Sequence, residues 1–127
     1  MAVLGFTTVG SQLKEQTDKV KEMGIEAFGV SVIDDAEGKH EPIKASNAQL
    51  HLFMQLKRGN VTHLILQSSE QAGIFLENIY SYYGKEKADR VLSAVKIIAI
   101  GDAEGPVKDR GLAFSVSESF LDALSSL

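Results

Sequence analysis

Three short segments rich in hydroxyl and glycine residues stand where a chain can hold an anion. They are 7–12 (TTVGSQ), 67–70 (QSSE) and 101–105 (GDAEG), and each follows an apolar run and precedes a helical pattern. The free N–H groups and the dipole at a helix start favour an anion there. The candidate residues for binding a small anion or a substrate are therefore Thr7, Thr8, Gly10, Ser11, Ser68, Ser69 and Gly101.

The same residue types also have a purely structural role. Ser11 and Ser68 are typical helix N-caps, which bond the first amide groups without any ligand. Glu70 and Asp102 suit helix starts as well, and their negative charge would repel an anion. Segment 7–12 contains no acid, so the sequence favours it as the place for a phosphate or a carboxylate.

The sequence offers no set of residues for acid–base, nucleophilic or metal chemistry. The chain has no cysteine, and His40, His51 and His63 do not follow a metal-ligand spacing. It contains no G-x-S-x-G sequence for a hydrolase nucleophile. The later loops lack the aromatic residues that would sandwich a flavin ring. We therefore assign no catalytic residue, and we expect no metal and no cofactor.

Five apolar runs alternate with helical patterns along the chain. The runs that predict strands are 2–7, 27–33, 61–67, 95–100 and 112–116. The clearest helix carries an apolar stripe at helical spacing, formed by Ala72, Phe75, Leu76, Ile79 and Tyr83. The run 97–100 is apolar on both faces, which is typical of a strand in a sheet that helices cover on both sides.

These patterns predict one α/β domain over residues 1–127. Strands that alternate with helices form a parallel sheet through right-handed crossovers. The expected fold is a flavodoxin-like, doubly wound, three-layer sandwich with a five-stranded parallel sheet in the order 2-1-3-4-5. Ligands of such sheets bind outside the carboxyl ends of the strands, so we expect the three segments to meet at one edge. The polar segment 34–45 is expected to be a loop.

The composition limits the kinds of partner. Thirteen residues are Lys or Arg and 17 are Asp or Glu, and the resulting net charge of −4 argues against a nucleic-acid-binding protein. No apolar run approaches the roughly 20 residues of a membrane span, and the first residues have no signal-peptide pattern. We expect a cytoplasmic protein that binds neither nucleic acid nor membrane.

Several segments of the second half of the chain resemble one enzyme family. They are 64–76 (LILQSSEQAGIFL), 95–101 (VKIIAIG), 110–112 (RGL) and 117–124 (SESFLDAL). These segments resemble the strand–Thr-Ser–helix unit, the strand ending in Ile-Gly, the Gly-Leu before the next strand and the closing helix of uroporphyrinogen-III synthases. The resemblance covers residues 60–127, and the first 35 residues fit a strand–helix–strand unit of that family more loosely.

The resemblance implies half of a larger enzyme. Members of the family are about twice as long, fold as two α/β domains and bind their substrate in the cleft between them. They cyclise the linear tetrapyrrole hydroxymethylbilane to uroporphyrinogen III without a cofactor. By position, Ser68 and Gly101 match the family's substrate-facing loops. Gln67 stands where the family has Thr, and the stretch 102–106 is shorter and more acidic than its counterpart.

The length leaves the origin and the function of the chain open. It could be a natural half-length relative or an engineered or excised half. Because one domain supplies half a cleft, we expect little or no synthase activity from it. A module that binds a small anion or a nucleotide phosphate is one alternative, and a synthase active only as a homodimer is another. The expected partner is a linear tetrapyrrole or a small anion, and the chain is a monomer or a homodimer.

Overall fold

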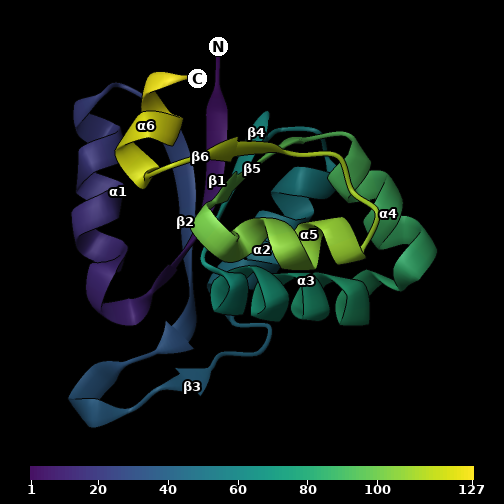
Figure 1. Ribbon diagram of the computed structural model, residues 1–127, viewed down its shortest axis with the longest axis horizontal. Helices are drawn as coiled ribbons and strands as arrows, with labels where there is room; N and C mark the ends of the chain where they lie inside the picture. Colours follow the sequence, from purple (N-terminus) through teal and green to yellow (C-terminus); the bar gives the residue numbers. More distant parts are fainter.

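The computed structural model describes residues 1–127, which form a six-stranded sheet with helices on both faces (Figure 1). The strands lie in the order β3-β2-β1-β4-β5-β6. Their bounds are β1 Val3–Val9, β2 Glu26–Asp34, β3 Glu41–Pro42, β4 His63–Gln67, β5 Lys96–Ile100 and β6 Ser115–Ser117. The helices are α1 Leu13–Glu22, α2 Asn47–Lys57, α3 Ser69–Tyr83, α4 Lys85–Ser93, α5 Glu104–Asp109 and α6 Phe120–Ser125. None of them combines the length and the apolar character that crossing a bilayer requires.

The sheet confirms the α/β fold class and corrects its details. The strands β2, β1, β4, β5 and β6 run parallel to one another, but β3 pairs with the end of β2 in the antiparallel direction. The sheet is therefore mixed and six-stranded, and the prediction of a purely parallel five-stranded sheet is wrong. The extra strand lies in the segment 34–45, which the sequence predicts to be a loop. The sequence did not indicate it, because two residues ending in a proline carry no strand periodicity. An edge strand tolerates this proline since its missing N–H faces no partner.

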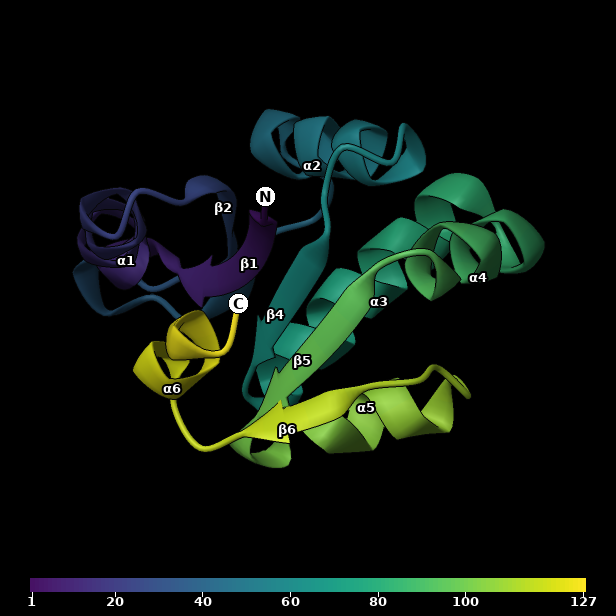
Figure 2. The same cartoon turned by 90° about the horizontal axis from the view of Figure 1, so that it is seen from above.

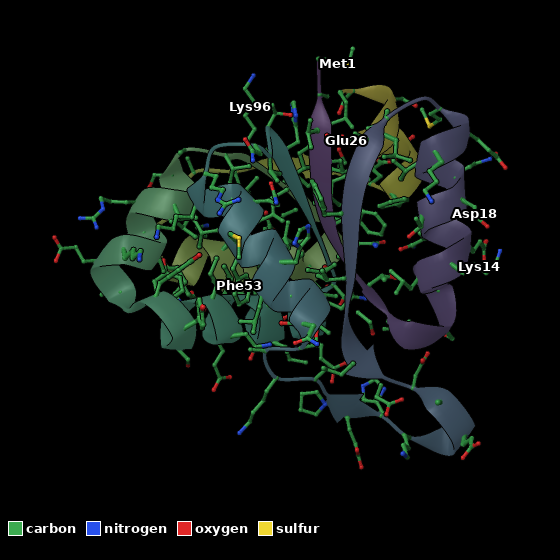
Figure 3. All side chains as sticks on the ribbon, turned by 180° about the vertical axis from the view of Figure 1, so that it is seen from behind. Met1, Lys14, Asp18, Glu26, Phe53 and Lys96 are labelled. Atoms are coloured by element: carbon green, nitrogen blue, oxygen red, sulfur yellow. The ribbon has the colours of Figure 1, made fainter.

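Helices lie on both sides of the sheet, as Figure 2 shows from above, and two apolar layers hold them to it. On one face α1 and α6 pack on Leu4, Phe6, Ile65 and Ile98. On the other face α2, α3, α4 and α5 cover a larger core of 22 buried residues that includes Leu64, Leu66, Ile97 and Ala99. Alternate residues of β4 and β5 enter the two layers, as the pleat of a strand requires. Figure 3 shows α1 and α2 on opposite sides of β1 and β2.

Gly29 in β2 makes room for the largest side chain of the smaller layer. Phe6 lies beside Gly29 in the pairing of β1 with β2, and its side chain is fully buried. A Cβ at Gly29 would lie 2.4 Å from Cζ of Phe6, closer than any real contact. The ring of Phe6 meets Phe120 of α6 edge to face, with centroids 5.1 Å apart. The glycine therefore allows the contact that attaches α6 to the sheet.

Candidate functional site

The three predicted segments do meet at one edge of the sheet, which we call the carboxyl edge (residues 7–12, 67–70 and 101–105). The side-chain amide of Gln67 donates to the backbone oxygen of Thr7 over 2.7 Å, which joins the first segment to the second. The backbone N–H of Ser69 donates to Oδ1 of Asp102 over 2.8 Å, which joins the second to the third. The parallel order of β1, β4 and β5 brings these residues together from positions up to 95 apart along the chain.

The first two candidate residues lie inside the protein and not in a loop. Thr7 and Thr8 belong to β1, and both side chains are fully buried. The hydroxyl of Thr7 donates to Oε1 of Gln71 over 3.1 Å and accepts the backbone N–H of Gln67 over 3.2 Å. Thr7 thus ties β1 to α3 and β4. The hydroxyl of Thr8, on the opposite face, is buried and has no hydrogen-bond partner. The loop after β1 therefore begins later than predicted, at Gly10, because threonine favours a strand as readily as a turn.

The second part of the first segment receives a carboxylate from the neighbouring strand. The backbone N–H of Ser11 donates to Oδ1 of Asp35 over 2.8 Å, and the Ser11 hydroxyl donates to Oδ2. These two hydrogen bonds, the hydroxyl's first, hold the pKa of Asp35 below its usual value. Gly10 lies beside this pair, and a Cβ there would be 3.3 Å from Oδ1 of Asp35.

The first segment contains no acid itself, but this contact brings one to it and corrects the prediction that an anion would be unopposed there. Asp35 follows β2, which lies next to β1 in the sheet, so its carboxylate reaches Ser11 from 24 positions away. Ser11 is also not the N-cap of α1. It lies in a short 3₁₀ turn, Gly10–Gln12, and α1 begins at Leu13 without a side-chain cap.

At the start of α3 the protein's own oxygen atoms likewise accept hydrogen bonds from the backbone N–H groups. The hydroxyl of Ser68 accepts the N–H of Gln71 over 3.2 Å, which confirms Ser68 as an N-cap, and Asp102 accepts the N–H of Ser69. Ser68 has a φ of 57° and a ψ of 156°, a conformation that a residue with a side chain rarely adopts. The carboxylate of Glu70 accepts a hydrogen bond from Nε2 of His40 over 2.8 Å.

Glutamine side chains complete the carboxyl edge, and two of them, Gln16 and Gln71, lie outside the predicted segments. Gln67 donates to Oε1 of Gln16 in α1 over 2.9 Å, in addition to its bond with Thr7. Together with Gln71 of α3, these amides link helices on both faces to the strand ends. The available signal was weak: a glutamine on the inward side of an amphipathic helix. No set of three or more His, Cys, Asp or Glu side chains lies close enough to hold a metal ion.

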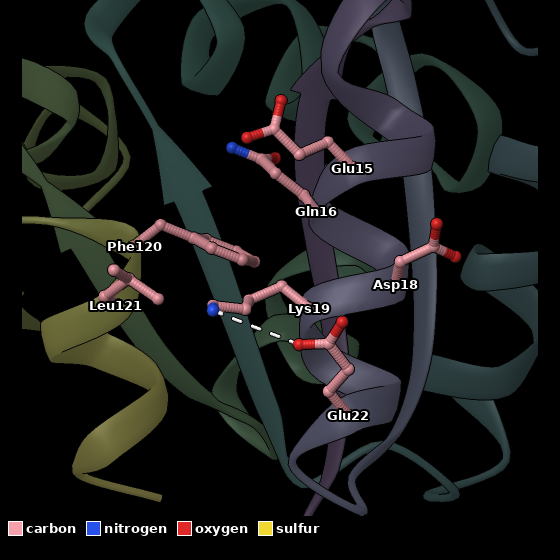
Figure 4. A pocket seen from close by; sticks show the side chains of 7 residues that line it. All are labelled: Glu15, Gln16, Asp18, Lys19, Glu22, Phe120 and Leu121. Carbon is pink, nitrogen blue, oxygen red and sulfur yellow. Dashed lines mark ion pairs between the residues drawn. The ribbon is translucent and has the colours of Figure 1, made fainter.

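Apart from the carboxyl edge, a hollow of about 470 Å³ lies between α1 and α6 (Figure 4). Its walls are Phe120 and Leu121 of α6 and a polar row on α1, consisting of Glu15, Gln16, Asp18, Lys19 and Glu22. Nζ of Lys19 lies 4.0 Å from Oε2 of Glu22. The other paired carboxylate of the lining, Asp18, contacts Lys14 of the same helix at 2.9 Å. These are ordinary exposed ion pairs along one helix, and they do not place a nucleophile next to a general base.

The comparisons with known proteins give one informative result. No protein-family model and no curated protein matches the sequence. Among solved structures, the fold is similar to the crystal structure of a mutant uroporphyrinogen III synthase from the extremely thermophilic bacterium Thermus thermophilus. The TM-score is 0.55 at 16% identity, and the match covers 97% of this chain and 48% of that one.

The chain resembles one half of a uroporphyrinogen III synthase. The resemblance inferred from residues 60–127 is thereby confirmed, and so is the mismatch in length, because this chain spans about half of that synthase. At 16% identity the likeness to the synthase shows the fold and not the activity. The binding role of the residues at the carboxyl edge, Ser68 and Gly101 included, stays a prediction.

Proposed function

We propose that this chain is a flavodoxin-like half-domain of the uroporphyrinogen III synthase type that does not cyclise hydroxymethylbilane as a single chain. One observation carries the proposal: the chain's own carboxylates occupy the amide groups that a substrate would use. Asp35 holds the N–H of Ser11, and Asp102 holds that of Ser69. The substrate of the synthase family bears eight carboxylates, and like charges at short range repel it from such an edge.

The length of the chain supports the same conclusion. Catalysis by positioning needs groups on both sides of the substrate. The chain spans 48% of the similar synthase and supplies one such side. A linear tetrapyrrole lying on the carboxyl edge would therefore face solvent on its other side.

The test is a hydroxymethylbilane cyclisation assay with analysis of the product isomers. We expect isomer III to stay at the spontaneous background across a hundredfold range of protein concentration. Isomer III above that background would contradict the proposal. A rate that rises with the square of the protein concentration, together with a dimer in sedimentation, would instead establish the homodimeric synthase.

A binding site for a small anion at the first segment is the second candidate. The buried hydroxyl of Thr8, which has no hydrogen-bond partner, favours it, because such a group is typical of a functional site. Its test is an NMR titration of Asp35→Asn, which removes the competing charge, against the unchanged protein with phosphate and FMN. Shifts at Thr8, Gly10 and Ser11 that are larger in the variant would support this candidate, and their absence in both proteins would exclude it.

A further inference from the structure

A basic groove lies on the helix layer, where α2 and α3 end and α4 begins. It has a volume of about 740 Å³ and lies between α2, α3 and α4, which are neighbours in Figures 1 and 2. Its lining, which we call the lysine groove, consists of Leu50, Met54, Lys57, Arg58, Tyr82, Tyr83 and Lys87. A smaller hollow of about 260 Å³ adjoins it and shares Lys57 and Lys87, so these two side chains stand between the hollows.

The three cations of the lysine groove have no acidic partner. None of the six ion pairs of the protein includes Lys57, Arg58 or Lys87. The acids of α4 are engaged with other residues: Asp89 pairs with Lys85 at 2.8 Å, and Glu86 pairs with Arg90 at 3.5 Å. In a chain with a net charge of −4, this groove is therefore a local concentration of unpaired positive charge.

The two lysines lie close enough to oppose each other's charge. The nearby amine of Lys57 is the main cause that lowers the pKa of Lys87. Lys57 ends α2, where the helix dipole favours a cation, so its position has an ordinary explanation. Lys87 lies in the first turn of α4, where the dipole disfavours a cation. The ammonium of Lys87 contacts the ring of Tyr83, but neither the dipole nor an ion pair balances its charge. An anion between the two amines would stabilise both.

Aromatic rings form the wall beside the lysines. Nζ of Lys87 lies 4.7 Å from the centroid of the Tyr83 ring, and the Tyr83 hydroxyl donates to the backbone oxygen of Phe53 over 3.0 Å. This ring is therefore held in place before any ligand arrives. Tyr82 is 56% exposed and Met54 is 43% exposed, which leaves an apolar surface next to the cations. Such a surface suits a planar ring.

We propose that the lysine groove binds a small molecule that joins a phosphate to an aromatic ring, with the phosphate between Lys57 and Lys87 and the ring against Tyr82. Ammonium groups bind phosphate as charge-assisted donors, and the aromatic wall supplies the contact area that inorganic phosphate cannot use. The site shares no residue with the carboxyl edge, so it does not depend on the function proposed above.

The test uses NMR titration of the full chain with three probes: phenyl phosphate, inorganic phosphate and phenol. We expect saturable shifts at the backbone amides of Lys57, Tyr82 and Lys87 with phenyl phosphate, and weaker binding of the other two probes. Lys57→Met and Lys87→Met should each weaken phenyl phosphate about tenfold, since each removes a charge-assisted hydrogen bond. Tyr82→Ala should weaken phenyl phosphate and leave inorganic phosphate unchanged.

Lys21→Met is the matched control, because Lys21 is an exposed lysine on α1 without an ion pair. It should bind phenyl phosphate like the unchanged protein. The proposal is overturned if phenyl phosphate causes no saturable shift at the groove. It is also overturned if Lys21→Met weakens binding as much as Lys57→Met, because binding would then follow net charge alone. All the altered side chains are on helix surfaces, and spectra of the unbound variants check that each is folded.

Discussion

Replacing Gly29 with alanine should destabilise the fold through one identifiable contact. The added Cβ would lie 2.4 Å from Cζ and 2.9 Å from Cε1 of Phe6, whereas carbon atoms in contact stay about 3.5–4.0 Å apart. The ring must move by about 1 Å, and it is fully buried against Phe120. Overpacking of this kind costs about 1–3 kcal/mol. With a typical urea dependence, we expect the unfolding midpoint to fall by roughly 1 M.

Gly73→Ala is the control that separates the clash from the change of residue type. Gly73 lies inside α3, and nothing lies within 4 Å of a Cβ placed there. Alanine is the better helix former, so this variant should gain about 0.5–1 kcal/mol. In a Phe6→Leu background the cost of Gly29→Ala should shrink, because the ring that it opposes is gone. The reasoning is refuted if Gly29→Ala leaves the midpoint unchanged or shifts it in the same direction as Gly73→Ala.

Three further predictions concern the polar groups of the sheet and its edges. Thr8→Val should stabilise the protein by about 1 kcal/mol, because it removes a buried hydroxyl without a partner. Thr7→Val should destabilise it by about 1 kcal/mol, because it breaks two hydrogen bonds. In urea unfolding, the two variants should shift the midpoint in opposite directions. Ser11 lowers the pKa of Asp35, so the ionised Asp35 stabilises the fold above the ordinary carboxylate pKa of about 4, and this contribution is lost as the pH falls further. The difference in unfolding midpoint between the protein and Asp35→Asn should therefore disappear at acid pH. A constant difference from pH 3 to 7 would contradict this. Burial raises the pKa of Tyr80 to about 12, so stability that depends on its neutral phenol should be lost as the pH rises from about 10 through 12. Ultraviolet titration should show one tyrosine ionising near pH 12, and this ionisation should be absent in Tyr80→Phe.

Much of the architecture could be predicted from local patterns. The apolar runs at 27–33, 61–67 and 95–100 became β2, β4 and β5 within two residues at each end. The last strand was misplaced: Ser115–Ser117 pairs with β5, while Leu112 is buried ahead of the strand. Its only large apolar residue, Val116, is 55% exposed, so this edge strand has no buried face to create a pattern.

The candidate sites show more clearly which features the sequence could not predict. Hydroxyl and glycine residues after each strand marked the carboxyl edge correctly as a meeting place. The sequence could not show that Asp35 and Asp102 would occupy the amide groups of that edge, because each acid follows one strand and reaches a segment that follows another. The lysine groove was also missed, since Lys57 and Lys87 are 30 positions apart on different helices.

The sequence by itself determined the alternation of strands and helices, the residues that face the core and the cap at Ser68. These features depend on side-chain periodicity and on hydrogen bonds within four residues of each other, which a linear sequence displays. The tertiary structure decided which charge meets which amide or amine. Electrostatic contacts depend on distances of a few ångströms between residues far apart in the chain, and only the packed sheet brings those residues together.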